Sequence, residues 1–111
     1  MQRIVVPPKT LNESLAVTID ASLGALAADV LSGGTATCVV YSGSDPSPSA
    51  MVGSGPVVDS ANMKLYLTFP GGVGVVGTIY QVVVKATFTN TQSGSSSRSY
   101  CLFLVLLPDA V

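Results

Sequence analysis

Histidine is absent from the 111-residue sequence, and its absence removes several kinds of chemistry at once. A chain without histidine has no His-based catalytic triad, lacks a common zinc ligand and lacks the most frequent general base. Four of the aspartates lie far apart in the sequence, with no pair at the spacing of a metal or glycosidase site: Asp20, Asp29, Asp45 and Asp59. We therefore expect a protein that is not an enzyme, with no catalytic residue, no metal site and no cofactor.

Charged residues are scarce as well. They make up 10% of the chain, against roughly 25% in ordinary soluble domains. The formal net charge of −1 is too small for a basic nucleic-acid footprint and for an acidic solvating tail. Because hydrophobic residues reach 48%, we expect part of the surface to be covered by a partner, in a homo-oligomer or a symmetric assembly.

Long hydrophobic runs are also missing. The longest candidate, residues 101–107, is far shorter than the ~18–20 residues that cross a membrane. The first residues contain Arg3 but no apolar stretch of the kind found in a secretory signal. These features predict no membrane partner, no nucleic-acid partner and synthesis in a cytoplasm.

The chain has two cysteines, Cys38 and Cys101, in separate predicted strands. One interpretation is an inter-sheet disulfide, as in secreted sandwiches. The other is a pair of small hydrophobic thiols, which the lack of a secretory signal favours. In an immunoglobulin-like strand order, strand 78–90 would separate strands 35–42 and 99–107. The two cysteines would then be about 9–10 Å apart, beyond the ~7 Å limit on Cα separation for a disulfide.

What the sequence does contain is a series of apolar runs, and the last third carries three of them, at 64–70, 78–90 and 98–108. Period-two alternation in the middle run predicts a half-buried strand, with Val83 as an apolar residue on the otherwise polar face. The last run is apolar on both faces, which predicts a strand that is covered twice or forms a sticky edge. Its two faces are Tyr100, Leu102, Leu104 and Leu106, and Cys101, Phe103, Val105 and Leu107.

The remaining segments complete a predicted all-β immunoglobulin-like sandwich of about seven strands, in one domain spanning residues 1–111 with a short N-terminal arm at 1–12. In chain order we expect an edge strand or arm at 3–9, a strand at 14–21, a weak helical turn or two within 23–31, a closing turn at Gly33-Gly34, a strand at 35–42, a loop at 43–49 and at most two short edge pieces within 51–59.

One stretch, residues 72–77, spells G-x-G-x-x-G. That motif binds a dinucleotide only where it opens a helix, whose N-terminus holds the pyrophosphate. Here an alternating strand follows instead. We therefore expect the glycines to form an irregular hairpin connection between strands 64–70 and 78–90, and the serines at 95–97 to form a loop tip.

The run from residue 71 to residue 106 resembles a pattern common in small virion proteins of tailed bacteriophages. A Gly-Gly turn leads to G-T-x-Y, then to an alternating V-x-V-x-A-T strand, a glycine-containing hairpin, an arginine and a closing apolar strand. The matching positions are Gly71, Gly72, Gly77, Thr78, Tyr80, Val82, Val84, Ala86, Thr87, Gly94, Arg98, Leu102 and Leu104. Upstream, LAVTIDASLGA is similar to the same family, whose members usually carry tryptophan there, whereas this chain has none.

This resemblance to tail-fibre adaptor or fibre-associated proteins implies an immunoglobulin-like fold and a structural role in the virion. The expected function is an adaptor that attaches tail fibres or other parts at the neck or tail, with other virion proteins as partners. A capsid cement or decoration protein is an alternative. A carbohydrate- or receptor-binding module is a more distant one, for which Tyr41, beside the loop at 43–49, is the candidate aromatic residue.

The interface expected for such an assembly lies on the closing strand and the N-terminal arm. One face of strand 99–107 should pack inside the sandwich, and the other should meet a second chain. An exposed row of this size would form an apolar patch that monomers rarely tolerate. The predicted interface residues are Cys101, Phe103, Val105, Leu107, Val5 and Val6.

Overall fold

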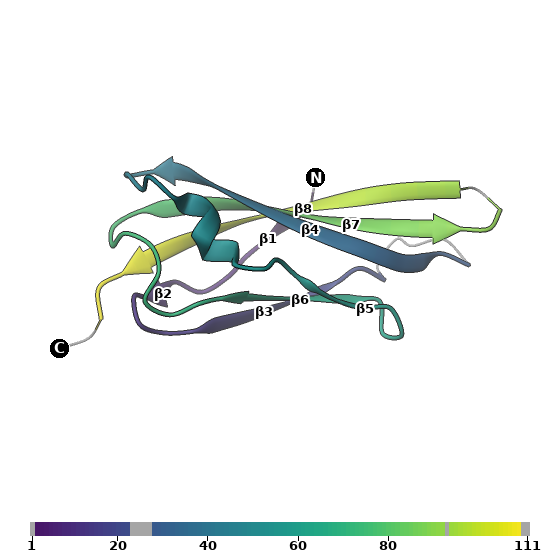
Figure 1. The fold of residues 1–111 in the computed structure, drawn as a ribbon, viewed down its shortest axis with the longest axis horizontal. Coiled ribbons are helices and arrows are strands. Elements are labelled where there is room, and N and C mark those ends of the chain that lie inside the picture. The colour runs from purple at the N-terminus through teal and green to yellow at the C-terminus, as the bar shows by residue number, and fades with distance from the viewer. Residues whose placement is uncertain (1, 23–27, 93, 110–111) are drawn as a thin grey trace.

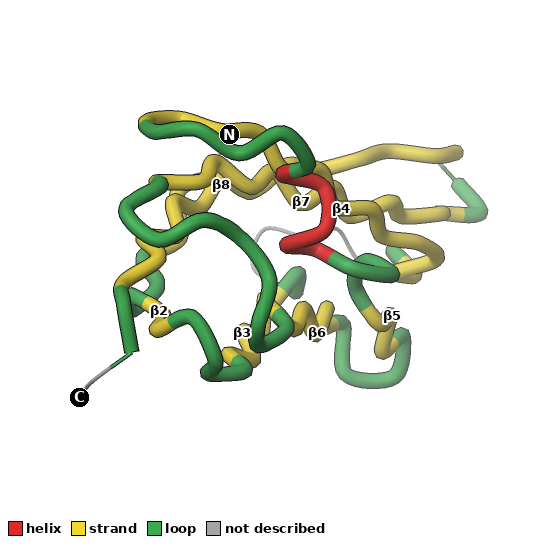
Figure 2. The backbone as a smooth tube through the Cα atoms, turned by 60° about the vertical axis from the view of Figure 1, so that its left-hand side comes forward, coloured by secondary structure: helices red, strands yellow, loops and turns green. Residues whose placement is uncertain are grey.

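Two β-sheets pack face to face in the computed structural model, which describes residues 2–22, 28–92 and 94–109 (Figure 2). The β-sandwich prediction is confirmed, with eight strands in place of about seven. The strands are β1 (Gln2–Ile4), β2 (Lys9–Thr10), β3 (Leu15–Asp20), β4 (Val30–Ser42), β5 (Val57–Asp59), β6 (Lys64–Phe69), β7 (Ile79–Asn90) and β8 (Gly94–Leu107).

The larger sheet has the order β1-β8-β7-β4, with β2 also paired to β8 (Figure 1). β7 runs antiparallel to both of its neighbours, whereas β1 and β2 run parallel to β8. The predicted placement of strand 78–90 between strands 35–42 and 99–107 is therefore confirmed. Cys38 pairs with Val82, while Cys101 pairs with the next residue, Val83, so the two cysteines occupy opposite faces. Both are free thiols.

Alternation along β7 and β8 builds one side of the core. Each inward side chain is at most 3% exposed, in the order Tyr80, Val82, Val84, Ala86 and Phe88 on β7 and Tyr100, Leu102, Leu104 and Leu106 on β8. The smaller sheet, with the order β3-β6-β5, supplies the opposite side. Leu65, Leu67 and Phe69 from β6 are fully buried, while Leu15 and Val17 from β3 are partly buried and pack against the core. The prediction of a half-buried strand at 78–90 is thus confirmed.

A short 3₁₀ helix, η1 (Pro48–Val52), closes the side of the sandwich between β4 and β6 (Figure 2). Its Met51 is fully buried and Val52 is 6% exposed. The prediction of two edge pieces within 51–59 is therefore wrong for the first piece, because the apolar pair turns into the core as a helical turn. Only β5, at Val57–Asp59, forms a strand.

The expected turn at Gly33-Gly34 is also wrong, since both glycines lie within β4. A Cβ atom on Gly34 would come within 2.8 Å of Leu65 Cδ2 and 3.3 Å of Pro56 Cγ. Glycine is needed here because the two sheets approach closely, which the sequence pattern does not distinguish from a turn. The helical turn expected within 23–31 falls partly on residues 23–27, outside the described residues, while Val30 and Leu31 already belong to β4.

The glycine-rich segment after β6 is a crossover and not a hairpin, because β6 and β7 belong to different sheets. Gly74 has a φ of +100°, and a Cβ atom there would lie 2.7 Å from Met51 Sδ and 2.9 Å from the Tyr80 hydroxyl. The segment leads into β7, so the G-x-G-x-x-G stretch opens no helix. Its Gly74 instead allows the chain to pack closely over the end of the core.

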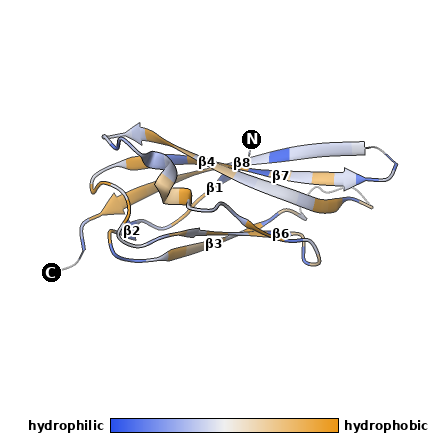
Figure 3. Ribbon diagram, viewed as in Figure 1, coloured by the Kyte–Doolittle hydropathy of each residue, from blue (hydrophilic) through white to orange (hydrophobic). Residues whose placement is uncertain are grey.

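The serines at 95–97 lie in β8 and not at a loop tip, because the β7–β8 ladder extends to the Asn90–Gly94 pair. Side chains in this first part of β8 are exposed, whereas alternate side chains are buried from Tyr100 onward. Figure 3 shows the same change along β8, from pale near Gly94 to orange at the arrowhead near Leu107. The apolar half of the strand is therefore the half that packs into the core.

Candidate functional site

The outward side of the larger sheet is the feature that stands out as a candidate site, because apolar side chains cover its middle. Cross-strand register places Val39, Gln81 and Phe103 in one row, with Thr37, Val83 and Cys101 in the next. Ile79 lies opposite Val105 on the other side of the first row. We call this set the outer apolar face: Val39, Tyr41, Ile79, Val83, Cys101, Phe103 and Val105.

Three side chains from three strands meet at Phe103. The Tyr41 ring stands edge-on to the Phe103 ring, with 4.9 Å between centroids and an interplanar angle of 72°, which is a favourable aromatic geometry. The Arg3 guanidinium lies 5.2 Å from the Phe103 centroid, within the range of a cation–π contact. Phe103 is thus positioned by both edges of the site while part of its ring stays accessible.

Two shallow hollows flank this cluster. The first, of about 310 Å³, is lined by Arg3, Tyr41, Ile79, Phe103 and Val105. The second, of about 230 Å³, lies on the arm side. It is lined by Arg3, Phe103 and Val105 together with residues 4–6. Hollows of this size accept single side chains of a partner, so the face is contoured as well as apolar.

The exposed fractions show how much of this face meets solvent. Val39 is 53% exposed and Tyr41 64%, while Phe103, Val105 and Cys101 are half-buried. Arg3 and Lys85, which the cross-strand register places on the outward side of this sheet, are both cations. Covering an apolar surface of this kind would remove apolar area from water, so the face is suited to contact with a partner.

The opposite surface of the molecule differs in character. On the outward side of the smaller sheet the Tyr66 hydroxyl donates to Asp59 Oδ2 at 2.9 Å, and Lys64 pairs across strands with Asp20 and with Asp59. Hydrogen bonds from Asn62 and Tyr66 hold the pKa of the Asp59 carboxyl below its usual value. Although Val57 is 65% exposed there, its neighbours are polar, so this surface is typical of solvent contact.

The structure brings together four of the six predicted interface residues around one hollow, namely Phe103, Val105, Val5 and Val6. Val5 is 89% exposed. Cys101 lies beside them in the ladder opposite Arg3, and Leu107, 41% exposed, lies where β2 pairs with β8. Val6, which lines this hollow, also packs against the core.

Several residues of this face were not predicted from the sequence. Arg3, Tyr41, Val39 and Ile79 come from other strands, and only the sheet order brings them to Phe103. Val83 did leave a signal, as the apolar residue that interrupts the polar face of the run at 78–90. Tyr41 left another, as an aromatic residue next to a loop rich in proline and serine.

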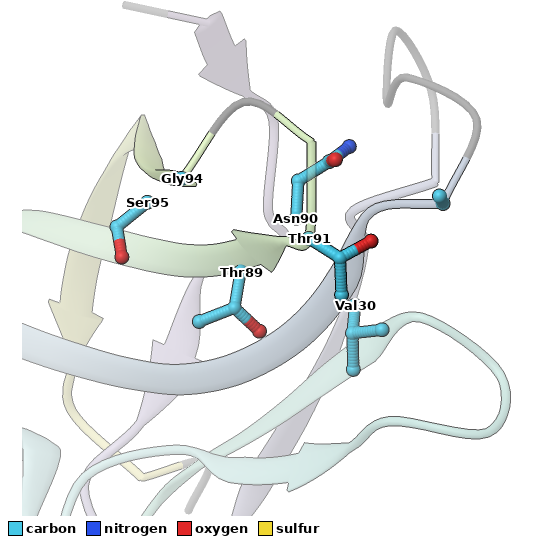
Figure 4. A pocket seen from close by; sticks show the side chains of 7 residues that line it. Val30, Thr89, Asn90, Thr91, Gly94 and Ser95 are labelled. Atoms are coloured by element: carbon cyan, nitrogen blue, oxygen red, sulfur yellow. The ribbon is translucent and has the colours of Figure 1, made fainter.

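A further hollow of about 220 Å³ lies at the far end of the sheet and is lined by Ala28, Val30, Thr89, Asn90, Thr91, Gly94 and Ser95 (Figure 4). Asn90 Nδ2 donates to Asp29 Oδ1 at 2.8 Å, and Asn90 Oδ1 accepts from the Gln92 amide at 2.9 Å. The lining consists of hydroxyl, amide and small apolar groups. It offers neither an activated nucleophile nor a metal-binding set.

The other polar contacts of note hold the structure together. The buried Tyr80 hydroxyl donates to Asp45 Oδ2 at 2.6 Å and accepts from the Val75 amide at 2.8 Å. Burial, followed by this bond to Asp45, raises the pKa of Tyr80. Burial likewise raises the pKa of the Cys38 thiol to about 11, so this sulfur is protonated and unreactive at neutral pH.

Within the described residues, no group of three or more potential ligands among histidine, cysteine, aspartate and glutamate could hold a metal ion. None of the helical structure in the described part of the chain is long and apolar enough to cross a membrane. Neither a scan of protein-family models nor a search of curated proteins finds a match to this chain. The resemblance to phage adaptor proteins therefore stays a prediction.

Proposed function

We propose that this chain is a structural component of a phage particle, an adaptor that attaches tail fibres or other parts at the neck or tail. The observation that carries the proposal is the outer apolar face, together with the adaptor-like sequence pattern at 71–106. An adaptor needs a rigid scaffold with a surface for its neighbours. A chain with 10% charged residues and an apolar sheet face has both.

Contacts through this face also account for the last run of the sequence. The inward row of β8 fills the core, while the outward row from Cys101 to Leu107 would be covered by a neighbouring chain. Burying apolar surface contributes about 25 cal/mol per Å². Covering the half-exposed outer apolar face would therefore stabilise a contact between subunits.

The assembly test uses two valines of similar exposure on opposite sheets. Val39→Asp places a charge within the outer apolar face, on its β4 side, and Val57→Asp places one on the polar side of the molecule. We expect the unaltered protein and Val57→Asp to sediment as oligomers at high concentration, and Val39→Asp to sediment as a species of fewer chains. Thermal melting should show all three folded, because 53% of Val39 and 65% of Val57 are already exposed.

Two outcomes would contradict the proposal: a soluble monomer of the unaltered protein at high concentration, or equal effects of the two substitutions. Electron microscopy of purified particles, labelled with an antibody against the chain, then tests the position. Label at the neck or tail supports an adaptor, whereas label over the head supports the cement protein.

A binding module is the second candidate, and the observation that favours it is the exposed Tyr41 ring beside the 310 Å³ hollow. Aromatic rings exposed at a hollow are suited to stacking against a sugar or a receptor side chain. Under this alternative Tyr41→Ala abolishes glycan-array or receptor binding while a monomer is the native form.

A further inference from the structure

The N-terminal segment is attached to β8 in two unequal parts. Residues 9–13 are held firmly: the Leu11 amide donates to Leu107 O at 3.1 Å, the Gly72 amide donates to Leu11 O at 2.7 Å, and the Asn12 amide donates to Asp109 Oδ1 at 3.0 Å. Residues 2–4 are held by a three-residue parallel ladder to Tyr100–Leu102. The first part of the segment is therefore held by a ladder and by side-chain packing, without the loop hydrogen bonds that also hold the second part.

The break between the two parts is built into the sequence. Ile4 pairs with Leu102 and Lys9 with Leu106. Between these two pairs the arm advances by five residues, whereas β8 advances by four. The extra residue leaves the ladder at Pro7-Pro8, where neither proline has an N–H to donate. Val5 is 89% exposed at this point, and a short stiff hinge of this kind favours exchange over tight closure.

Release of residues 2–6 would uncover a site that fits the same segment again. Ile4 and Val6 pack against the core, and Arg3 covers the Phe103 ring. Once they leave, the edge of β8 at Tyr100–Leu102 presents unpaired backbone groups, a template for another strand. The segment that matches this register and these contacts on a second copy is its own residues 2–6.

We propose that residues 2–6 exchange between two copies of the chain, so that β1 of each copy pairs with β8 of the other. Exchange of an identical element preserves every native contact and closes a symmetric dimer at low cost. The inference deepens the proposed function, on which it rests, by naming a contact between subunits. That contact borders the outer apolar face, since Arg3 lies over the ring of Phe103, a member of that face.

The chain supplies its own reporter, because Arg3 lies opposite Cys101 in the ladder. Neighbouring strands are about 4.8 Å apart, within the Cα separation of about 4.4–6.8 Å that a disulfide needs. In Arg3→Cys, a closed arm forms an internal bridge that runs as a monomer on a non-reducing denaturing gel. An exchanged arm forms the same bridge between chains and runs as a covalent dimer.

The protein is refolded at low and high concentration and then oxidised. We expect the covalent dimer to increase several-fold with concentration at the expense of the bridged monomer. Bridged monomer alone at every concentration would overturn the inference. Val57→Cys, which places a thiol away from the arm, measures collisional cross-linking. Arg3→Cys with Cys101→Ser should give no bridged monomer and no more dimer than Val57→Cys. A dimer yield of Arg3→Cys alone no higher than that of Val57→Cys would also overturn the inference.

The same variant separates this inference from the proposed function. Arg3→Cys combined with Val39→Asp should still give covalent dimer, because Val39 lies outside the exchanged contacts. If no exchange occurs while Val39→Asp still prevents oligomer formation, strand exchange is wrong and the assembly face stands. If exchange occurs while Val39→Asp changes nothing, exchange stands and the assembly face is wrong.

Discussion

Two buried tyrosines show how much a single hydroxyl group depends on its surroundings. Tyr80 and Tyr100 lie on the same face of the larger sheet and are 0% and 1% exposed. The Tyr80 hydroxyl links the loop before η1 to the glycine-rich crossover through Asp45 and Val75. Among the described residues, the Tyr100 hydroxyl is the buried side-chain polar atom without a hydrogen-bond partner.

Replacing each tyrosine by phenylalanine should therefore have opposite effects on the free energy of unfolding. Tyr80→Phe leaves the Val75 amide and the Asp45 carboxylate without their partner, which costs about 1–3 kcal/mol. Tyr100→Phe removes an unpaired buried hydroxyl and should leave stability unchanged or raise it. Urea unfolding of the two variants measures the difference, and equal losses of stability would contradict this account.

At the level of elements, β4 shows why neighbouring glycines in one strand are not equivalent. A Cβ atom on Gly33 would meet Thr87 Cβ at 3.7 Å, an ordinary contact on the outward face. A Cβ atom on Gly34 would meet the side chain of Leu65, which is fully buried and packed between the sheets. The close approach of β4 to β6 is thus possible because Gly34 has no side chain.

We expect Gly34→Val to destabilise the protein by about 1–3 kcal/mol, because it forces Leu65 out of its packed position. Gly33→Val should be tolerated, since a β-branched residue suits an outward strand position. Thermal melting of the two variants provides the comparison. A similar melting temperature for both would show that the sheets can separate locally at no cost.

On the scale of the whole molecule, the sandwich is elongated, with extents of 53 × 21 × 21 Å. The end of the β7–β8 hairpin reaches beyond the smaller sheet (Figure 1). Near Gly94 the strand β8 pairs with β7 alone, whereas β1 joins its other edge at Tyr100–Leu102. Stability should therefore be distributed unevenly along this strand.

Hydrogen exchange should report that unevenness. We expect backbone amides at 94–98 to exchange much faster than those at 102–106, where alternate side chains are buried in the core. Mass spectrometry of peptides covering the two halves of β8 measures both rates. Uniform protection along β8 would contradict this picture, and protection of 94–98 that appears only in assembled protein would place a contact on the hairpin end.

The sequence by itself determined the strands and the side of each that faces the core, because alternation is a local property that each run carries whatever its partners. It predicted β7 as a half-buried strand and separated the two rows of β8. The outward row led to Phe103 and Val105 as candidate interface residues. Charge content pointed in the same direction, since a surface this poor in charge favours contact with a partner.

Only the tertiary structure decided which residues from different strands contact one another. The parallel pairing of the arm brings Arg3 to Phe103, the order β8-β7-β4 brings Tyr41 and Val39 to the same face, and the passage of residues 71–77 between sheets replaces the expected hairpin. Glycine occurs both in turns and where two strands pack closely, so the sequence pattern at Gly34 predicted a turn. The contact with Leu65 shows that close packing is the reason for this glycine. These contacts join residues far apart in the chain, and they depend on how two sheets pack, which no single run specifies.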